Sequence, residues 1–106
     1  MNHTPVILFI DTSAVDTARV SLTVDGGTFE KKKESRMLKS QTLLPLIGEL
    51  LHEHSRALSD ITDISVFLGP GSFTGLRVGC TVANALGMLL SVPVNGKRDL
   101  ATPIYS

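Results

Sequence analysis

Apolar and polar positions follow one another with changing periods along this chain, and each period predicts a type of element. Residues 6–10 (VILFI) form a continuous apolar run that ends at Asp11, which is typical of a strand buried on both faces in the middle of a sheet. Residues 18–24 (ARVSLTV) alternate between apolar and polar, as a half-buried strand does. The DGG sequence at 25–27 predicts a hairpin turn, and the lysine-rich segment 28–35 suits a strand at the edge of the sheet.

The second half of the chain predicts two helices separated by a strand. Leucine and isoleucine recur at helical spacing within residues 40–58, and residues 64–68 (ISVFL) form another fully apolar strand. A helix follows over about 74–90, and the last strand is the short 92–94 (VPV). This order predicts an α/β fold of the ribonuclease-H-like type: a mixed five-stranded sheet with an antiparallel hairpin at its edge, two main helices and right-handed crossovers.

Composition narrows the class of protein without changing this arrangement. The chain has 106 residues, of which 42% are hydrophobic and 19% charged, so we expect one folded domain. Ten basic side chains balance ten acidic ones, which excludes a general attraction to nucleic acid or to an anionic membrane. Cys80 is the single cysteine, so a reducing, cytoplasmic setting without an internal disulfide is expected. Arg77 and other polar residues interrupt the longest apolar stretch, so no membrane span is expected.

The segment 69–79, GPGSFTGLRVG, lies between an apolar strand and an apolar helix and invites a chemical interpretation. A phosphate-binding P-loop needs a Lys-Ser or Lys-Thr pair at the start of the helix, and none follows here. The dinucleotide-binding spacing G-x-G-x-x-G is missed by one residue. A nucleophile elbow at Ser72 lacks the G-x-S-x-G spacing, and all three histidines precede this serine, whereas the usual order places the histidine after it. Nucleotide-binding and nucleophilic interpretations are therefore weak.

Packing explains the same segment better. Gly69 and Gly71 allow an abrupt turn from strand to helix, and Ser72 or Thr74 can cap the helix. Small residues then recur at every fourth position and give the helix a nearly smooth side that another backbone can approach closely. These residues are Gly75, Gly79, Ala83 and Gly87.

Other polar residues offer little chemistry. Asp11 stands where ribonuclease-H-like nucleases carry a metal-binding carboxylate, but the strand that should supply another acid ends without one. His52 and His54 are two residues apart and so point to different sides of a helix, which does not suit a metal pair. We therefore expect no metal site. The lysines at 31–33 alternate across a strand; protection of the sheet edge is the favoured interpretation, and an RNA backbone contact is the alternative.

The second helix is more apolar than a surface helix of a small domain. Between residues 75 and 90 the polar side chains are Arg77, Thr81 and Asn84, which share one narrow face. Such a helix should be covered on more than one side, and a chain of this length has little material left for a second cover. We therefore expect the helix to contact another protein or a second copy of the chain.

Four stretches resemble the TsaB (YeaZ) family, the accessory subunit of the bacterial machinery that makes threonylcarbamoyladenosine (t6A) in tRNA. They are ILFIDTS, LLPLIGELL, GPGSFTGLRVG and ALGMLLSVPV. The resemblance implies a first lobe of the actin-like ATPase fold over residues 1–96, with residues 97–106 as a tail or the start of an uncompleted element. The family glycine segment is matched by Gly69, Pro70, Gly71, Ser72, Phe73, Thr74, Gly75, Arg77 and Gly79.

The resemblance also implies a function. It points to a non-catalytic subunit without a cofactor of its own, which binds and stabilises a TsaD-type transferase, works with a TsaE-type ATPase in the cytoplasm, and reaches tRNA only through that complex. Without TsaD, the same helical surface is expected to form a homodimer. The candidate partner contacts are Leu43, Leu46, Ile47, Leu50, Val78, Val82, Ala85 and Leu89.

Two alternatives stay open. One is a minimal actin-like ATPase or phosphotransferase that uses Asp11 and residues 69–75. The resemblance to the TsaB family implies that Asp11 and Thr12 stand at the position of a vestigial phosphate site. The other alternative is a structural lobe that forms a homodimer and retains no further role.

Overall fold

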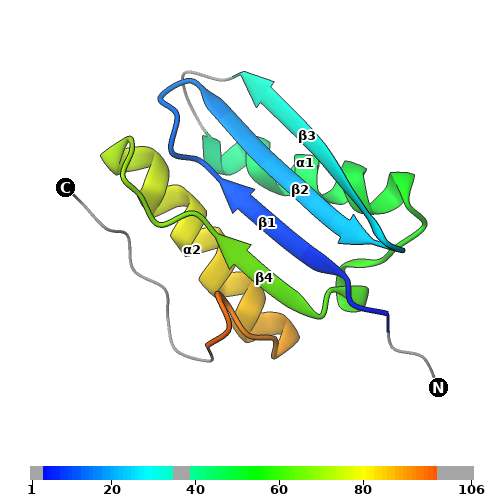
Figure 1. Cartoon of the computed structure of the whole chain (residues 1–106). Helices are drawn as coiled ribbons and strands as arrows, with labels where there is room; N and C mark the ends of the chain where they lie inside the picture. The colour runs from blue at the N-terminus through cyan, green and yellow to red at the C-terminus, as the bar shows by residue number, and fades with distance from the viewer. Residues whose placement is uncertain (1–3, 35–38, 98–106) are drawn as a thin grey trace.

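The computed structural model describes residues 4–34 and 39–97, which fold as a sheet with helices packed against it (Figure 1). The strands are β1 (Ile7–Asp11), β2 (Thr17–Val24), β3 (Gly27–Glu34) and β4 (Asp63–Val66). The helices are α1 (Lys39–Glu53) and α2 (Phe73–Leu90), and a short 3-10 helix, η1 (Leu58–Asp60), precedes β4. The predicted hairpin and both main helices are therefore confirmed.

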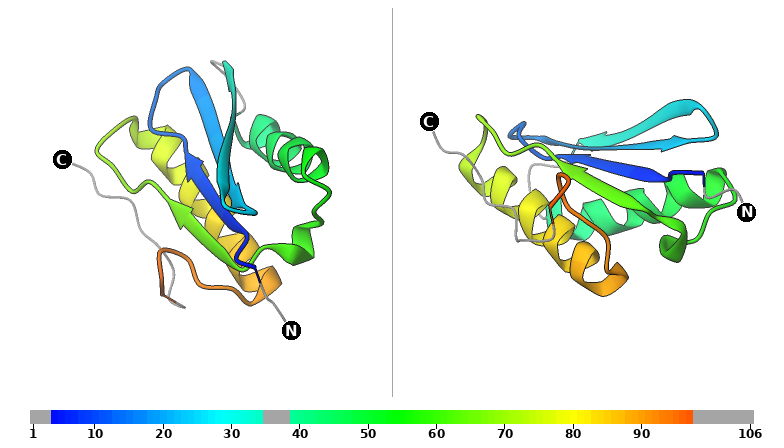
Figure 2. Two further views of the ribbon diagram at one scale, coloured as in Figure 1. Left: turned by 45° about the vertical axis from the view of Figure 1, so that its right-hand side comes forward. Right: turned by 60° about the horizontal axis from the view of Figure 1, so that its bottom comes forward.

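The described residues form a four-stranded sheet in the order β3-β2-β1-β4. β2 is antiparallel to β1 and β3, whereas β4 is parallel to β1. Both helices lie on one face of the sheet, with α1 over β2 and β3 and α2 over β4 and β1 (Figure 2). We call the other face the open face; no described residue covers it, and it carries Ile7, Phe9 and Asp11 of β1 with their cross-strand neighbours.

The predicted fifth strand at 92–94 is wrong: among the described residues, Val94 makes only isolated bridges, one parallel with Ile64 and one antiparallel with Lys97. Asn95 explains why the pairing stops there. Its side-chain amide accepts a hydrogen bond from the Val66 N–H at 2.8 Å and donates one to the Val66 carbonyl at 3.1 Å. Asn95 and Gly96 both have positive φ, so the backbone turns away while this side chain pairs with β4 in place of a further strand residue.

The core lies between the sheet and the two helices. Alternate residues of β1, β2 and β4 point toward the helices and are buried, among them Leu8, Ile10, Val20, Leu22, Ile64 and Val66. The apolar run of β1 predicted a strand buried on both faces, but the described residues bury it on one face only. Ile7 and Phe9, on the open face, are half-buried.

The small residues of α2 pack against the sheet, as the sequence predicts. A Cβ atom added at Gly79 would collide with the Thr12 hydroxyl and lie 3.5 Å from Ile10 and Val66 side chains. The Thr12 hydroxyl itself donates a hydrogen bond to the Gly75 carbonyl at 2.5 Å. Close approach of α2 to the end of β1 therefore requires glycine at position 79.

The helix α2 begins at a cap that also fixes the preceding turn. The Ser72 hydroxyl accepts a hydrogen bond from the Gly75 N–H, and the Ser72 N–H donates to the Ser13 carbonyl at 2.7 Å. Gly71 lies so close to Ser13 that a Cβ there would be 2.9 Å from the Ser13 carbonyl oxygen. These contacts hold the glycine segment against the loop that follows β1.

Two glycine-to-alanine changes separate packing from helix propensity. Gly79→Ala should lower the free energy of unfolding by about 1–3 kcal/mol, because the methyl group has no room against Thr12. Gly48→Ala, on an exposed side of α1 with nothing within 4 Å of the added Cβ, should raise it by about 0.5–1 kcal/mol. Urea unfolding followed by circular dichroism measures both. Equal effects of the two changes would contradict this packing.

Asn95→Gly tests the contact that ends the sheet. Glycine keeps the positive φ of this position but removes both hydrogen bonds to Val66, so the free energy of unfolding should fall by about 1–3 kcal/mol. The same urea titration measures it. A variant as stable as the parent chain would show that the amide contributes nothing to the edge of β4.

Candidate functional site

The most unusual surface of the described chain is the outer side of α2, opposite its small residues. Three large apolar side chains are mostly exposed there: Phe73 at 52%, Met88 at 73% and Leu89 at 73%. Ala85 is also exposed, and Val78 and Val82 are half-buried at the margin, where they pack against the chain's own core. We call these six residues, together with Arg77, the α2 outer face. Arg77 is the one charged side chain of this surface, and the exposed Thr81 lies among the same residues, so the surface is apolar with two polar side chains at its centre.

Arg77 does not interrupt this apolar character as strongly as its charge suggests. Its guanidinium carbon lies 5.0 Å from the centre of the Phe73 ring, which is the geometry of a cation–π contact. The contact holds the cation beside the aromatic ring at the first turn of α2. Phe and Arg are residue types that are enriched in the cores of protein interfaces, and so is Met.

The structure places the eight predicted partner contacts on two different kinds of surface. Val78, Val82, Ala85 and Leu89 lie on the α2 outer face, and their contact with a partner stays a prediction. The four residues of α1 are buried in the chain's own core: Leu43, Leu46, Ile47 and Leu50. A buried side chain cannot meet a partner without unfolding, so the prediction is wrong for these four.

The correction on α1 has a physical reason. The buried residues of α1 form one continuous stripe at helical spacing, and a helix with one such stripe turns it toward its own sheet. Leu44 falls outside that stripe and is 51% exposed. Three exposed apolar residues were not among the predicted partner contacts: Leu44 on α1, and Phe73 and Met88 on α2. The sequence does indicate that Leu44 is exposed, because its position lies outside the apolar stripe of α1.

The glycine segment serves packing and capping in the described structure. Ser72 is the N-cap of α2, and Gly75 and Gly79 are buried against β1. Pro70, Gly71, Phe73 and Thr74 are exposed at the turn. The hydroxyl of Ser72 is engaged by the Gly75 N–H, which gives it a structural task.

The two residues of the vestigial phosphate site face different surroundings. Thr12 is 1% exposed and its hydroxyl is bonded to the Gly75 carbonyl. Asp11 is half-buried, and its Oδ1 accepts hydrogen bonds from the N–H and the hydroxyl of Ser13 at 2.9 and 2.6 Å. Asp11 lines a small pocket of about 170 Å³ with Ser13, Ala14, Thr17, Arg19 and Lys32, and Thr12 does not.

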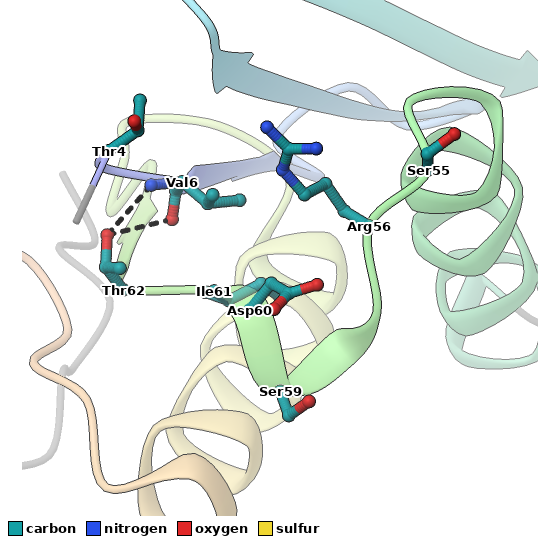
Figure 3. A pocket seen from close by; sticks show the side chains of 8 residues that line it. All are labelled: Thr4, Val6, Ser55, Arg56, Ser59, Asp60, Ile61 and Thr62. Atoms are coloured by element: carbon teal, nitrogen blue, oxygen red, sulfur yellow. Dashed lines mark hydrogen bonds between the residues drawn. The ribbon is translucent and has the colours of Figure 1, made fainter. Parts of the chain in front are cut away.

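A larger pocket of about 460 Å³ opens beside the loop after α1 (Figure 3). It is lined by Thr4, Val6, Ser55, Arg56, Ser59, Asp60, Ile61 and Thr62. Its polar groups serve the fold: the Thr62 hydroxyl bonds the backbone of Val6, and Asp60 accepts from the Ala57 N–H. Arg56 forms a two-point contact with Asp25 at 2.8 and 2.9 Å. This pocket is therefore explained by the way in which the loop after α1 is folded.

The remaining titratable groups add no reactive cluster in the part of the chain that the structure describes. No three His, Cys, Asp or Glu residues there come together to hold a metal ion. Burial raises the pKa of the Cys80 thiol, which lies inside the core. The hydrogen bond with Glu53 raises the pKa of Lys31, an ion pair with N–O distance 2.5 Å. The described helix α2 is long and apolar enough to cross a membrane by composition, but its small side packs on the sheet as a core helix does.

Comparison with known proteins agrees with this arrangement. Residues 33–105 match the sequence model of the TsaD family, tRNA N6-adenosine threonylcarbamoyltransferase. The chain is 33% identical to the tRNA threonylcarbamoyladenosine biosynthesis protein TsaB of Escherichia coli over 91% of its own length and 41% of that protein. It is 46% identical to a tRNA N6-adenosine threonylcarbamoyltransferase of Nitrosospira multiformis, over 60% of this chain and 18% of that enzyme.

The fold matches as well as the sequence. The solved structure of YeaZ from Pseudomonas aeruginosa superposes with a TM-score of 0.79 at 34% identity, covering 85% of this chain and 42% of that one. The chain therefore spans about two fifths of the TsaB and YeaZ proteins it matches. The glycine segment and the capped α2 lie within the residues that the TsaD family model matches. The chain belongs to the TsaD protein family and, within it, is of the TsaB (YeaZ) type.

Proposed function

We propose that the chain is a non-catalytic accessory subunit that binds and stabilises a TsaD-type transferase in t6A modification of tRNA. The observation that carries this proposal is the α2 outer face. More than half of the surface of Phe73, Met88 and Leu89 meets water in the chain alone. Soluble proteins rarely leave apolar side chains of this size together on one helix unless a partner covers them.

The kind of partner follows from the chain's own relationship. The TsaD family model matches residues 33–105, a range that includes α1 and α2. A TsaD-type protein therefore has counterparts of these two helices. Two related surfaces can pack about an approximate two-fold axis, in which each helix meets its counterpart. The same geometry supports a homodimer of this chain when no transferase is present.

The described residues support an accessory role over a catalytic one. The glycine segment is used for packing, Ser72 caps a helix, and the Thr12 hydroxyl binds a backbone carbonyl. We infer that residues 1–96 act as one lobe, that a TsaE-type ATPase and tRNA join through the transferase, and that the complex works in the cytoplasm. The minimal ATPase alternative would need groups that Thr12 and the glycine segment do not offer.

Charge on the α2 outer face should break the complex without breaking the fold. Ala85→Glu and Leu89→Glu each place a carboxylate at an exposed position. Each should weaken binding to the TsaD-type protein of the same organism by about 100-fold, because an unpaired charge buried in an interface costs about 3 kcal/mol or more. Size-exclusion chromatography with light scattering measures the mixed complex, and circular dichroism checks the fold.

Ser59→Glu is the matched control, since Ser59 is exposed and belongs to η1, outside the α2 outer face. It should bind as the parent chain does. Unchanged binding by Ala85→Glu and Leu89→Glu would move the interface to another surface. If the parent chain binds no TsaD-type protein, the accessory function is refuted and the homodimeric structural lobe is favoured. Binding of ATP by the chain alone, lost in Asp11→Asn, would favour the ATPase alternative.

A further inference from the structure

The tight turn at residues 94–97 carries a sequence that can modify itself. Asn95 and Gly96 are its two central residues, and Val94 and Lys97 exchange backbone hydrogen bonds across it at 2.8 and 3.0 Å. Both central residues have positive φ, as a type I′ turn requires and as Asn-Gly sequences favour. The α2 outer face does not include this turn, so the proposed partner surface does not account for it.

Asparagine followed by glycine is chemically labile, because the glycine nitrogen has no side chain to shield it from the asparagine amide. Attack of the Gly96 nitrogen on Cγ of Asn95 forms a succinimide ring, and the side-chain nitrogen leaves as ammonia with the proton that the Gly96 N–H gives up. Water then opens the ring. Cleavage of the new bond gives aspartate, and cleavage of the original peptide bond gives isoaspartate. The reaction consumes water, releases ammonia and needs no oxidant or enzyme.

The folded chain leaves the attacking nitrogen free and holds the amide that it attacks. The Gly96 N–H donates to no residue in the described ranges, and a Cβ added there would meet nothing within 4 Å. Asn95 is exposed, so water can reach it. Its Oδ1 atom, however, accepts from the Val66 N–H at 2.8 Å, and its Nδ2 atom donates to the Val66 carbonyl at 3.1 Å. Because both polar atoms of the amide bond to β4, the amide must leave Val66 before Cγ can turn toward the Gly96 nitrogen.

Opening of the turn therefore controls the reaction. Few contacts hold the turn: the Val94 side chain is buried beside Gly87 of α2, and the Asn95 N–H donates to the Ile64 carbonyl at 2.8 Å. The turn meets β4 through an isolated bridge and not through a strand. A segment with few backbone hydrogen bonds can open locally while the rest of the protein stays folded.

We propose that Asn95 is a self-modification site, which converts to aspartate and isoaspartate when the turn 94–97 opens. The product removes the contact that closes the edge of β4. In aspartate a carboxylate oxygen replaces the NH₂ group, so the Val66 carbonyl loses its donor and faces another acceptor. Isoaspartate also adds a carbon to the backbone of the turn. The site goes beyond the proposed function, since it needs no transferase and lies outside the α2 outer face.

Peptide mapping of the chain after incubation at mildly alkaline pH tests the site. Cleavage by trypsin after Arg77 and Lys97 gives one peptide that contains both Asn95 and Asn84. Asn84 lies inside α2 and is followed by Ala85, so it is an internal control. Mass spectrometry should find aspartate and isoaspartate at position 95 and unchanged asparagine at position 84.

The same incubation in urea measures how far the fold protects the site. Conversion of Asn95 should be about tenfold or more faster in the unfolded chain, where no contact with Val66 holds the amide. Gly96→Ala should slow the reaction in urea by about tenfold, because the added methyl group shields the attacking nitrogen. The comparison in urea does not depend on whether this variant folds.

Two matched valine variants test whether the opening is local. Val94→Ala removes the packing that anchors the turn but keeps Asn95 and Gly96, so conversion in the folded chain should be about fivefold or more faster. The rate in urea should not change. Val20→Ala makes the same truncation at a buried position of β2, outside the turn, and should leave the rate in the folded chain close to that of the parent.

Three outcomes would overturn the proposal: an Asn95 that stays intact in urea, equal conversion in the folded and the unfolded chain, or equal acceleration by the two valine variants. The effect on the sheet is measured separately. Asn95→Asp reproduces the aspartate product and should unfold at a lower urea concentration than the parent chain. An unchanged urea midpoint would refute the loss of the contact at the edge of β4.

Discussion

The end of β1 is held against α2 by the hydrogen bond from the Thr12 hydroxyl to the Gly75 carbonyl, and much of the structure depends on this contact. It needs the helix backbone within reach of a strand, and only glycine at position 79 leaves that room. The Ser13–Ser72 backbone hydrogen bond extends the same contact into the loop before α2. Together they fix how α2 is rotated about its own axis.

That rotation decides what each surface of the chain can do. The small residues of α2 turn toward the sheet, so its larger apolar residues Phe73, Met88 and Leu89 turn outward. The same anchoring of Thr12 sends the neighbouring Asp11 side chain to the opposite face of the sheet, as strand alternation requires. The surface proposed to bind a partner and the small pocket beside Asp11 are therefore on opposite sides of one buried contact.

The sequence predicted what depends on period and on local turn chemistry. The hairpin, the two helices and the packing role of the α2 glycines were all accessible from spacing. The absence of a fifth strand was not accessible in this way. One side chain, that of Asn95, ends the pairing by bonding to Val66, which is far away in the sequence. Periodicity also cannot tell which apolar stripe of α1 meets the sheet, and the predicted partner contacts of Leu43 and Leu50 fail for this reason.

The small pocket beside Asp11 could be predicted only in part from the sequence. A two-residue turn at Asp25 and Gly26 fixes every cross-strand pair of the β2–β3 hairpin, including Arg19 with Lys32. Alternation then places both cations on one face. The contribution of Asp11 could not be read this way, because it belongs to a different strand and its orientation depends on the bonds to Ser13.

The composition of α2 links stability to partner binding. Its buried side combines the small residues Gly75, Gly79, Ala83 and Gly87, which remove little apolar surface from water when they pack, with the larger Leu76, Cys80 and Leu86. Its outward side carries Phe73, Met88 and Leu89, whose burial by a partner would remove further apolar surface from water. A partner that covers the outward side therefore binds the folded chain and not the unfolded one, and it stabilises the fold by mass action. The close contact at Thr12 requires small residues on the buried side of α2, which limits the apolar surface that the chain can bury by itself. The same contact leaves Phe73, Met88 and Leu89 exposed, and a partner that covers them buries further apolar surface.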